Sequence, residues 1–140
     1  MDSIEVYIEK NLSEKRRTHV YGVAAESEKL ALKYGGDAQK ARTAALFHDM
    51  FRSTPVEVLN MYVRQLGMSP VYLDNANLAH GPIAAFVMER EYGITDPDLL
   101  NAVRYHTTGR AGMSLLEKIV FLADAIEPGR NYPGVEKARE

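Results

Sequence analysis

Residues 44–52 read Ala44-Ala45-Leu46-Phe47-His48-Asp49-Met50-Phe51-Arg52, an apolar run in which a histidine and an aspartate stand side by side. A packed apolar segment ordinarily excludes an ionised carboxylate, because removing water from an unpaired charge is costly. Something must therefore compensate the charge of Asp49, and a metal or phosphate site is the simplest explanation for the pair.

Helical spacing of apolar residues extends from this run towards the N-terminus, where three helices are predicted. Their N-caps are predicted to be Ser3, Ser13 and Asp37. The second helix has His19 on its inward-facing stripe and stops at Gly35-Gly36. The third helix carries His48 and Asp49 in its last turn, so the pair is expected at a helix end.

Further helices are predicted on the C-terminal side of the run. One starts in the capping box Thr54-Pro55-Val56-Glu57, with proline at the first helical position, and ends at Gly67. After it, only a short helical turn around residues 71–75 is expected. Pro82 is predicted to start the next helix, which places His80 at or just before its N-terminus.

Two more helices are predicted, each with a candidate site residue at or near its C-terminal end. Asp96-Pro97 starts a helix with His106 at its end. The loop that follows contains Thr107-Thr108-Gly109, which could approach a phosphate with backbone and hydroxyl donors. Ser114-Leu115-Leu116-Glu117 forms a second capping box and starts an apolar helix with Asp124 in its last turn. No alternating strand pattern occurs, so the predicted fold is all-α.

Length and composition limit the function classes. A chain of 140 residues suits one compact helical domain spanning residues 1–140, with another helix beginning within 130–140. A net charge of -2 gives no general attraction for nucleic acid or membrane, so neither is an expected partner. No signal sequence or long apolar run is present, which predicts a cytoplasmic protein. Without cysteine, any metal must be bound by histidine and carboxylate.

Asp49 and Asp124 share an unfavourable position. Each lies near the C-terminal end of an apolar helix, where the helix dipole disfavours a negative charge by roughly 0.3–1 kcal/mol. A divalent cation reverses this balance, and carboxylate oxygen and neutral imidazole are suitable ligands for manganese, iron or zinc. The predicted metal ligands are His19, His48, Asp49 and Asp124.

Each of these residues also has a structural interpretation. A single buried histidine is more often a hydrogen-bonded core residue than a ligand, and an isolated aspartate can be a salt-bridge partner or a cap. The joint pattern of four histidines and two misplaced aspartates favours a functional site. Most loops like Thr107-Thr108-Gly109 are only turns, and Lys15-Arg16-Arg17 is predicted to be a solvated face.

The spacing of His19, His48-Asp49 and Asp124 resembles the HD superfamily of metal-dependent phosphohydrolases, over nearly the whole chain. Longer motifs resemble its bacterial YqeK-type branch. These are Arg16-x-x-His19-Val20, residues 44–49, Ala79-His80-Gly81-Pro82, residues 101–110 and residues 116–130. Members of this branch usually continue past Pro133-Gly134-Val135, so a final helix is expected beyond the present sequence.

The resemblance implies a symmetrical diadenosine tetraphosphate hydrolase that releases two ADP and uses one or two ions. Iron is the expected metal, with manganese, cobalt and zinc as alternatives. By position it implies metal ligation by the four residues above and catalytic roles for Asp49, His80 and His106. The residues expected around the nucleotide phosphates are His19, His80, His106, Thr107, Thr108, Gly109 and Arg130.

Several alternatives follow from the same residues. Many HD proteins have lysine where this chain has Arg52. Arginine keeps the positive charge but is a poor proton carrier, so Arg52 is expected to contact a phosphate. His80 and His106 could hold the phosphate, protonate the leaving ADP or bind a second metal. The alternative functions are hydrolysis of another nucleotide and a non-catalytic nucleotide- or metal-binding module. A homodimer that pairs through the apolar first helix is a further expectation.

Overall fold

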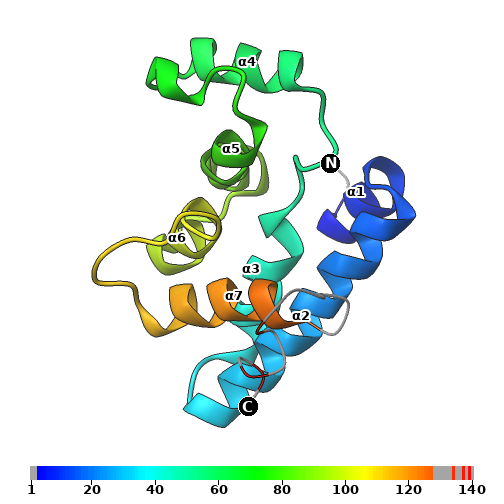
Figure 1. Cartoon of the computed structure of the whole chain (residues 1–140), viewed down its shortest axis with the longest axis vertical. Coiled ribbons are helices and arrows are strands. Elements are labelled where there is room, and N and C mark those ends of the chain that lie inside the picture. Colours follow the sequence, from blue (N-terminus) through cyan, green and yellow to red (C-terminus); the bar gives the residue numbers. More distant parts are fainter. Residues whose placement is uncertain (1–2, 128–133, 135–136, 138, 140) are drawn as a thin grey trace.

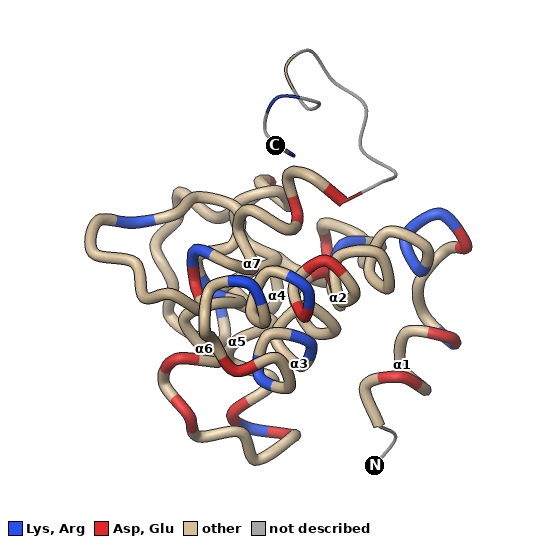
Figure 2. Tube along the Cα trace, turned by 90° about the horizontal axis from the view of Figure 1, so that it is seen from below, with Lys and Arg blue, Asp and Glu red and all other residues tan. Residues whose placement is uncertain are grey.

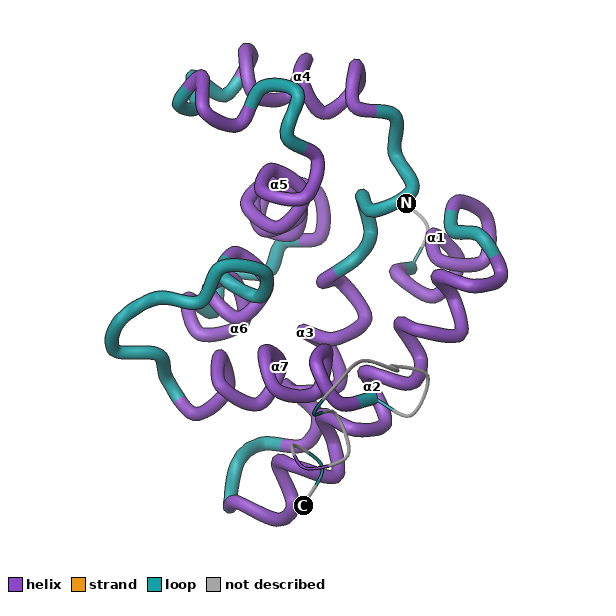
Figure 3. The backbone as a smooth tube through the Cα atoms, in the orientation of Figure 1, coloured by secondary structure: helices purple, strands orange, loops and turns teal. Residues whose placement is uncertain are grey.

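The computed structural model describes residues 3–127, 134, 137 and 139. In this part of the chain the secondary structure is helical throughout, with no strand (Figures 1 and 3), so the all-α prediction is confirmed. The elements are α1 (Ile4–Asn11), α2 (Glu14–Tyr34), α3 (Ala38–His48), α4 (Val56–Gln65), the 3-10 helix η1 (Pro70–Tyr72), α5 (Ala76–Tyr92), α6 (Pro97–Arg104) and α7 (Leu115–Ile126).

The predicted caps of five helices are confirmed. The side chains of Ser3, Ser13, Asp37, Asp96 and Ser114 accept hydrogen bonds from backbone N–H groups in the first turns of α1, α2, α3, α6 and α7. At α7 both halves of the capping box form, because the Glu117 side chain also accepts from the Ser114 N–H. These starts are determined by a few neighbouring residues, which explains why the sequence predicts them well.

The capping box predicted at Thr54 is wrong. Pro55 itself is the N-cap of α4, with ψ of 143°, and no side-chain cap bond forms. Because Pro55 is extended, the helix starts one residue later than the box requires, and Glu57 no longer occupies the third helical position. The short turn predicted at residues 71–75 is instead the 3-10 helix at 70–72.

The predicted start of α5 is also wrong, and the difference matters for the site. Asn75 caps this helix by accepting from the N–H of Leu78, so α5 begins at Ala76. His80 and Pro82 consequently lie inside the helix rather than at its N-terminus. The first turn of α5 therefore supplies a helical carbonyl beneath His80, which the predicted start would not have provided.

Helix α3 lies at the centre of the arrangement and contacts α1, α2, α5, α6 and α7 (Figure 1). Its fully buried alanines, Ala41, Ala44 and Ala45, allow the neighbouring helices to approach closely. His48 ends the helix and Asp49 caps it, both buried. The central position of α3 thus brings the His48-Asp49 pair to the meeting point of the other helices.

Residues of both charge signs are distributed along the chain. Basic and acidic residues are interspersed along the chain trace (Figure 2). None of the helices in the described part is long and apolar enough to cross a membrane. The helix expected to begin within residues 130–140 falls largely outside the described residues.

Candidate metal centre

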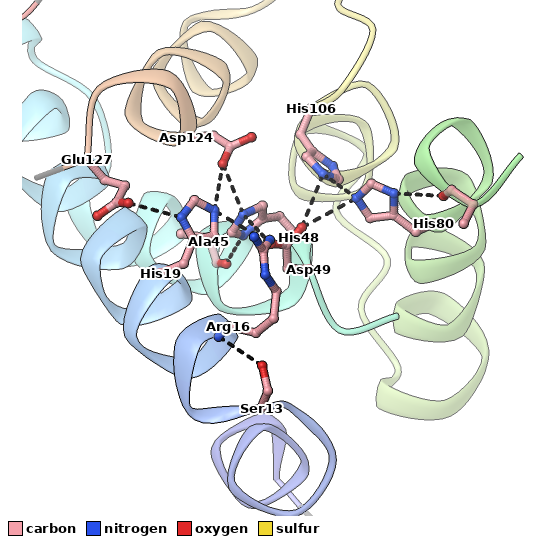
Figure 4. A network of polar contacts seen from close by, with 11 residues as sticks. Ser13, Arg16, His19, Ala45, His48, Asp49, His80, His106, Asp124 and Glu127 are labelled. Carbon is pink, nitrogen blue, oxygen red and sulfur yellow. Dashed lines mark hydrogen bonds and ion pairs between the residues drawn. The ribbon is translucent and has the colours of Figure 1, made fainter. Parts of the chain in front are cut away.

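Six histidine and aspartate side chains converge from five helices (Figure 4). His19 comes from α2, His48 and Asp49 from the end of α3, and His80 from α5. His106 follows the end of α6, and Asp124 lies in the last turn of α7. The structure therefore brings together every predicted metal ligand as well as His80 and His106.

The first group of donor atoms consists of His19, His48 and Asp124. The Asp124 Oδ1 atom lies 2.8 Å from Nε2 of His19 and 3.6 Å from Nε2 of His48. The Oδ2 atom of Asp49 lies 3.5 Å and 3.6 Å from the same two nitrogens. The four residues predicted as metal ligands thus surround one point.

The second group consists of Asp49, His80 and His106. Nε2 of His80 lies 3.0 Å from Nε2 of His106. The Oδ1 atom of Asp49 is 3.4 Å from the His80 nitrogen and 3.8 Å from the His106 nitrogen. Asp49 therefore directs one carboxylate oxygen to each group and stands between them.

The main chain sets the tautomer of three histidines. Nδ1 of His48, His80 and His106 lies 2.5 Å, 3.1 Å and 2.6 Å from the carbonyl oxygens of Ala45, Ala76 and Val103. A carbonyl oxygen only accepts hydrogen bonds, so each Nδ1 carries a proton. The opposite ring nitrogen, Nε2, is left free to bind a metal, an arrangement typical of metal-ligating histidine.

His19 has a different partner, which sequence reasoning missed. Its Nδ1 lies 3.2 Å from Oε1 of Glu127, and both side chains are buried. Glu127 directly follows α7 and is 108 residues away from His19 in the chain. A contact over this separation leaves no local pattern, so only the motif at residues 116–130 drew attention to the segment.

The donor atoms fit divalent metal ions. Two ligands that each lie about 2.0–2.2 Å from one ion are separated by roughly 3.0–3.5 Å at tetrahedral or octahedral angles. The donor separations of 2.8–3.8 Å in the two groups are close to this range. In addition, the fully buried Nε2 of His48 has no hydrogen-bond partner among the described residues, which is costly unless the atom binds something else.

The electrostatics of the site also require positive charge. Burial alone would lower the pKa of His48, but Asp49 and Asp124 outweigh it and raise the pKa to about 9. Burial would raise the pKa of Asp49, yet His48, His80 and His106 hold this pKa well below its usual range. Burial and the neighbouring His48 and His80 lower the pKa of His106 to about 3, which keeps its imidazole neutral. The buried Asp49, the partly buried Asp124 and the imidazole nitrogens suit a divalent cation, which would take the place of the proton on His48.

A cavity of about 310 Å³ opens onto both groups. Its lining residues are Arg16, Asp49, Arg52, Asn77, His80, His106, Thr107, Phe121, Asp124 and Ala125. Arg16 donates to Oδ2 of Asp49 at 2.9 Å, so its assignment to a solvated face is wrong. Arg16 precedes His19 by three residues on α2 and shares its face, a signal that could have identified it. Asn77 and Phe121 were not predicted either.

The other predicted substrate contacts are distributed unevenly. Thr107 lines the 310 Å³ cavity, whereas Thr108 lines a neighbouring cavity of about 120 Å³ that Thr107 also borders. Gly109 lines neither cavity; its φ is 67°, and a side chain there would meet Phe121. Arg130 lies outside the described residues.

Comparison with known proteins places this architecture in a family. The chain matches the HD domain over residues 16–129, and it belongs to this family. Bis(5'-nucleosyl)-tetraphosphatase, symmetrical, from Bacillus subtilis is 42% identical over 95% of the chain and 72% of its own length. The protein of the same description from Halalkalibacterium halodurans is 44% identical over 94% of the chain and 71% of its own length.

A solved structure supports the same assignment. A Clostridium acetobutylicum protein, described as a "predicted HD superfamily hydrolase involved in NAD metabolism", superposes with a TM-score of 0.91. It is 41% identical, and the match covers 99% of the present chain and 76% of the other. Together with the donor groups, family membership indicates that the chain binds a divalent metal.

Proposed function

We propose that this chain is a metal-dependent hydrolase that cuts diadenosine tetraphosphate symmetrically into two ADP. The observation that carries the proposal is the position of Asp49, whose two oxygens face separate donor groups at a cavity that Arg16 and Arg52 also line. The relatives that are 42–44% identical over most of the chain are described as symmetrical bis(5'-nucleosyl)-tetraphosphatases.

We propose two metal ions, one in each donor group, with Asp49 shared between them. Iron is the proposed metal, and manganese, cobalt and zinc are the alternatives, because imidazole and carboxylate suit all four. When bound, such ions lower the pKa of a coordinated water and neutralise charge on a phosphate. His80 and His106 are better placed as ligands of the second ion than as proton donors, since Nδ1 of each is held by a carbonyl oxygen.

The remaining roles belong to the protein's own side chains. Asp49 serves as the shared metal ligand rather than as a proton acceptor, because its pKa is held well below the usual range, and its ion pair with Arg16 fixes the orientation of the carboxylate. Arg16 and Arg52 supply positive charge at the cavity for the bridging phosphates. A cavity of about 310 Å³ is near the lower limit for ligand sites, so it suits the centre of the polyphosphate rather than the whole dinucleotide.

The decisive experiment is product analysis with metal-loaded and metal-free protein. We expect ADP as the only product from diadenosine tetraphosphate, and no turnover without metal. Asp49→Ala should abolish both hydrolysis and stoichiometric metal binding, because it removes a ligand from each group. Glu28→Ala is the matched control, since it removes a half-exposed surface carboxylate that pairs with Arg42 at 3.1 Å.

Four outcomes would contradict the proposal. Formation of AMP and ATP would show asymmetric cleavage, and full activity of metal-free protein would exclude metal catalysis. Turnover of another nucleotide in place of diadenosine tetraphosphate would favour the alternative hydrolase. Nucleotide binding without turnover under several metals would favour a regulatory module.

A cytoplasmic location and a homodimer remain predictions. The first helix, named above as a dimer contact, buries Ile4 and Ile8 in the core. Val6 on the same helix is 38% exposed, so only part of its apolar surface remains available to a second copy.

A further inference from the structure

The two donor groups differ in what supports one of their histidines, because His48 in the first group is also held by a carbonyl oxygen and only His19 is not. In the second group, Nδ1 of His80 and His106 donates to neutral carbonyl oxygens of the main chain. In the first group, Nδ1 of His19 lies 3.2 Å from the carboxylate of Glu127. A carboxylate is a stronger acceptor than a carbonyl and increases the basicity of the opposite ring nitrogen. The metal-binding nitrogen of His19 is therefore the more electron-rich.

The distribution of negative charge differs in the same direction. The first group has Asp124 as a ligand and Glu127 behind His19, in addition to its share of Asp49. Among the described residues, the second group has Asp49 as its only carboxylate. Arg16 lies 2.9 Å from Oδ2 of Asp49, the oxygen that faces the first group, and so offsets part of the additional negative charge there. Because cation affinity increases with nearby carboxylate charge, the first group should bind a divalent ion more tightly.

Gly22 makes the Glu127 contact feasible. It follows His19 by three residues on α2 and so occupies the same face of the helix. A Cβ atom at this position would lie 2.7 Å from Oε2 of Glu127, closer than any side chain could tolerate. Glycine is a poor residue inside a long helix, and here its missing side chain leaves space for the carboxylate.

We infer that Glu127, which packs against Gly22, is a positioning residue that gives the His19–His48–Asp124 group the higher metal affinity of two unequal sites. The inference rests on the metal-dependent function proposed above. It adds an order of occupancy, in which the first group binds its ion at low metal concentration and the second group at higher concentration. It also assigns to Glu127 and Gly22 a role in metal affinity rather than only in packing.

The test is titration of metal-free protein with Co²⁺, followed by visible absorption and by metal content after dialysis. Wild-type protein should bind two ions with separable affinities. Glu127→Gln keeps the shape of the side chain but removes its charge, and should weaken the tighter site about 10–100-fold while leaving the weaker site unchanged. Gly22→Ala should have the same effect, because the added methyl group displaces the Glu127 carboxylate.

Glu117→Gln is the matched control. It removes a buried carboxylate from α7, the helix that Glu127 directly follows, but Glu117 accepts hydrogen bonds from Arg110 and the Ser114 N–H and does not contact a site histidine. We expect this variant to lose stability and retain both Co²⁺ affinities. A merely structural role of Glu127 would make the two glutamine variants behave alike.

Several outcomes separate the inference from the proposed function. Wild-type protein that binds no divalent metal would overturn both. Metal-dependent hydrolysis with two equal Co²⁺ affinities, or unchanged affinities in both Glu127→Gln and Gly22→Ala, would overturn the inference alone. Equal weakening of the two sites in Glu127→Gln would also overturn it.

Discussion

Replacing Gly81 by alanine should force α5 away from α6 and displace a ligand of the second metal group. A Cβ atom on Gly81 would lie 3.1 Å from the carbonyl oxygens of both Val103 and Arg104, and 3.3 Å from Cε1 of His106. The two oxygens belong to the main chain at the end of α6, so they cannot rotate away as a side-chain tip would. The helices must therefore separate by a few tenths of an ångström.

The size of the effect follows from two opposing contributions. Forcing an extra methyl group into a packed contact typically costs about 1–3 kcal/mol. Alanine inside a helix is more favourable than glycine by about 0.5–1 kcal/mol, which offsets part of this cost. We expect Gly81→Ala to lower the free energy of unfolding by about 0.5–2 kcal/mol. Because His106 is bonded to the displaced Val103 carbonyl, Co²⁺ affinity of the second group should fall as well.

Urea denaturation and Co²⁺ titration of the same variant measure both effects. Gly36→Ala is the control, because its Cβ would lie 3.2 Å from Cδ1 of Ile119 and 3.4 Å from Cδ2 of Leu115. These are mobile side-chain ends away from the metal groups, so this variant should keep both Co²⁺ affinities. If Gly81→Ala is as stable as wild type and binds Co²⁺ equally well, the close approach of α5 and α6 does not position His106.

Two further predictions concern charged residues. Arg52→Ala should raise KM for diadenosine tetraphosphate about 10-fold, because it removes a phosphate contact worth roughly 1.5 kcal/mol. In steady-state kinetics Arg52→Lys should have an intermediate KM, and Arg64→Ala, which changes an exposed residue, should have the wild-type KM. A fall in kcat at constant KM would contradict a phosphate-binding role of Arg52. Burial opposes ionisation of Glu117, but bonds from Arg110 and Ser114 hold its pKa below the ordinary 4.5. The stability that ionised Glu117 contributes is therefore present above about pH 4.5 and is lost on acidification. By urea denaturation, Glu117→Gln should have a free energy of unfolding about 1–3 kcal/mol below that of wild type at pH 7, and this difference should become smaller below pH 4.5. A difference that does not change with pH would refute the ionic contribution.

Local signals in the sequence predicted most of the helices correctly. Ser13, Asp37 and Ser114 cap their helices as expected, because a cap bond joins residues only a few positions apart. The prediction failed at the start of α5. Pro82 was the only start signal considered there, whereas in the structure the Asn75 cap determines where the helix begins.

The candidate site was predictable to the extent that its residues were unusual in their own helices. The misplaced charges of Asp49 and Asp124 indicated a cation, and the structure places each of them in a group of donor atoms that could hold one. The roles of Arg16 and Glu127 at the site were not predicted, because charged residues are common at the start or end of a helix. Their significance depends on contacts to Asp49 and His19 that only the packing of α2, α3 and α7 creates.

The bonds from Nδ1 of His48, His80 and His106 to carbonyls three or four residues earlier have a mechanical consequence. Each ring is attached to the main chain of its own helix and cannot change direction unless that helix moves. The coordination geometry is therefore a rigid-body property of α3, α5 and α6. A Co²⁺ ion bound here would report small shifts between these helices through its absorption spectrum, even when the shift begins at a distant core residue.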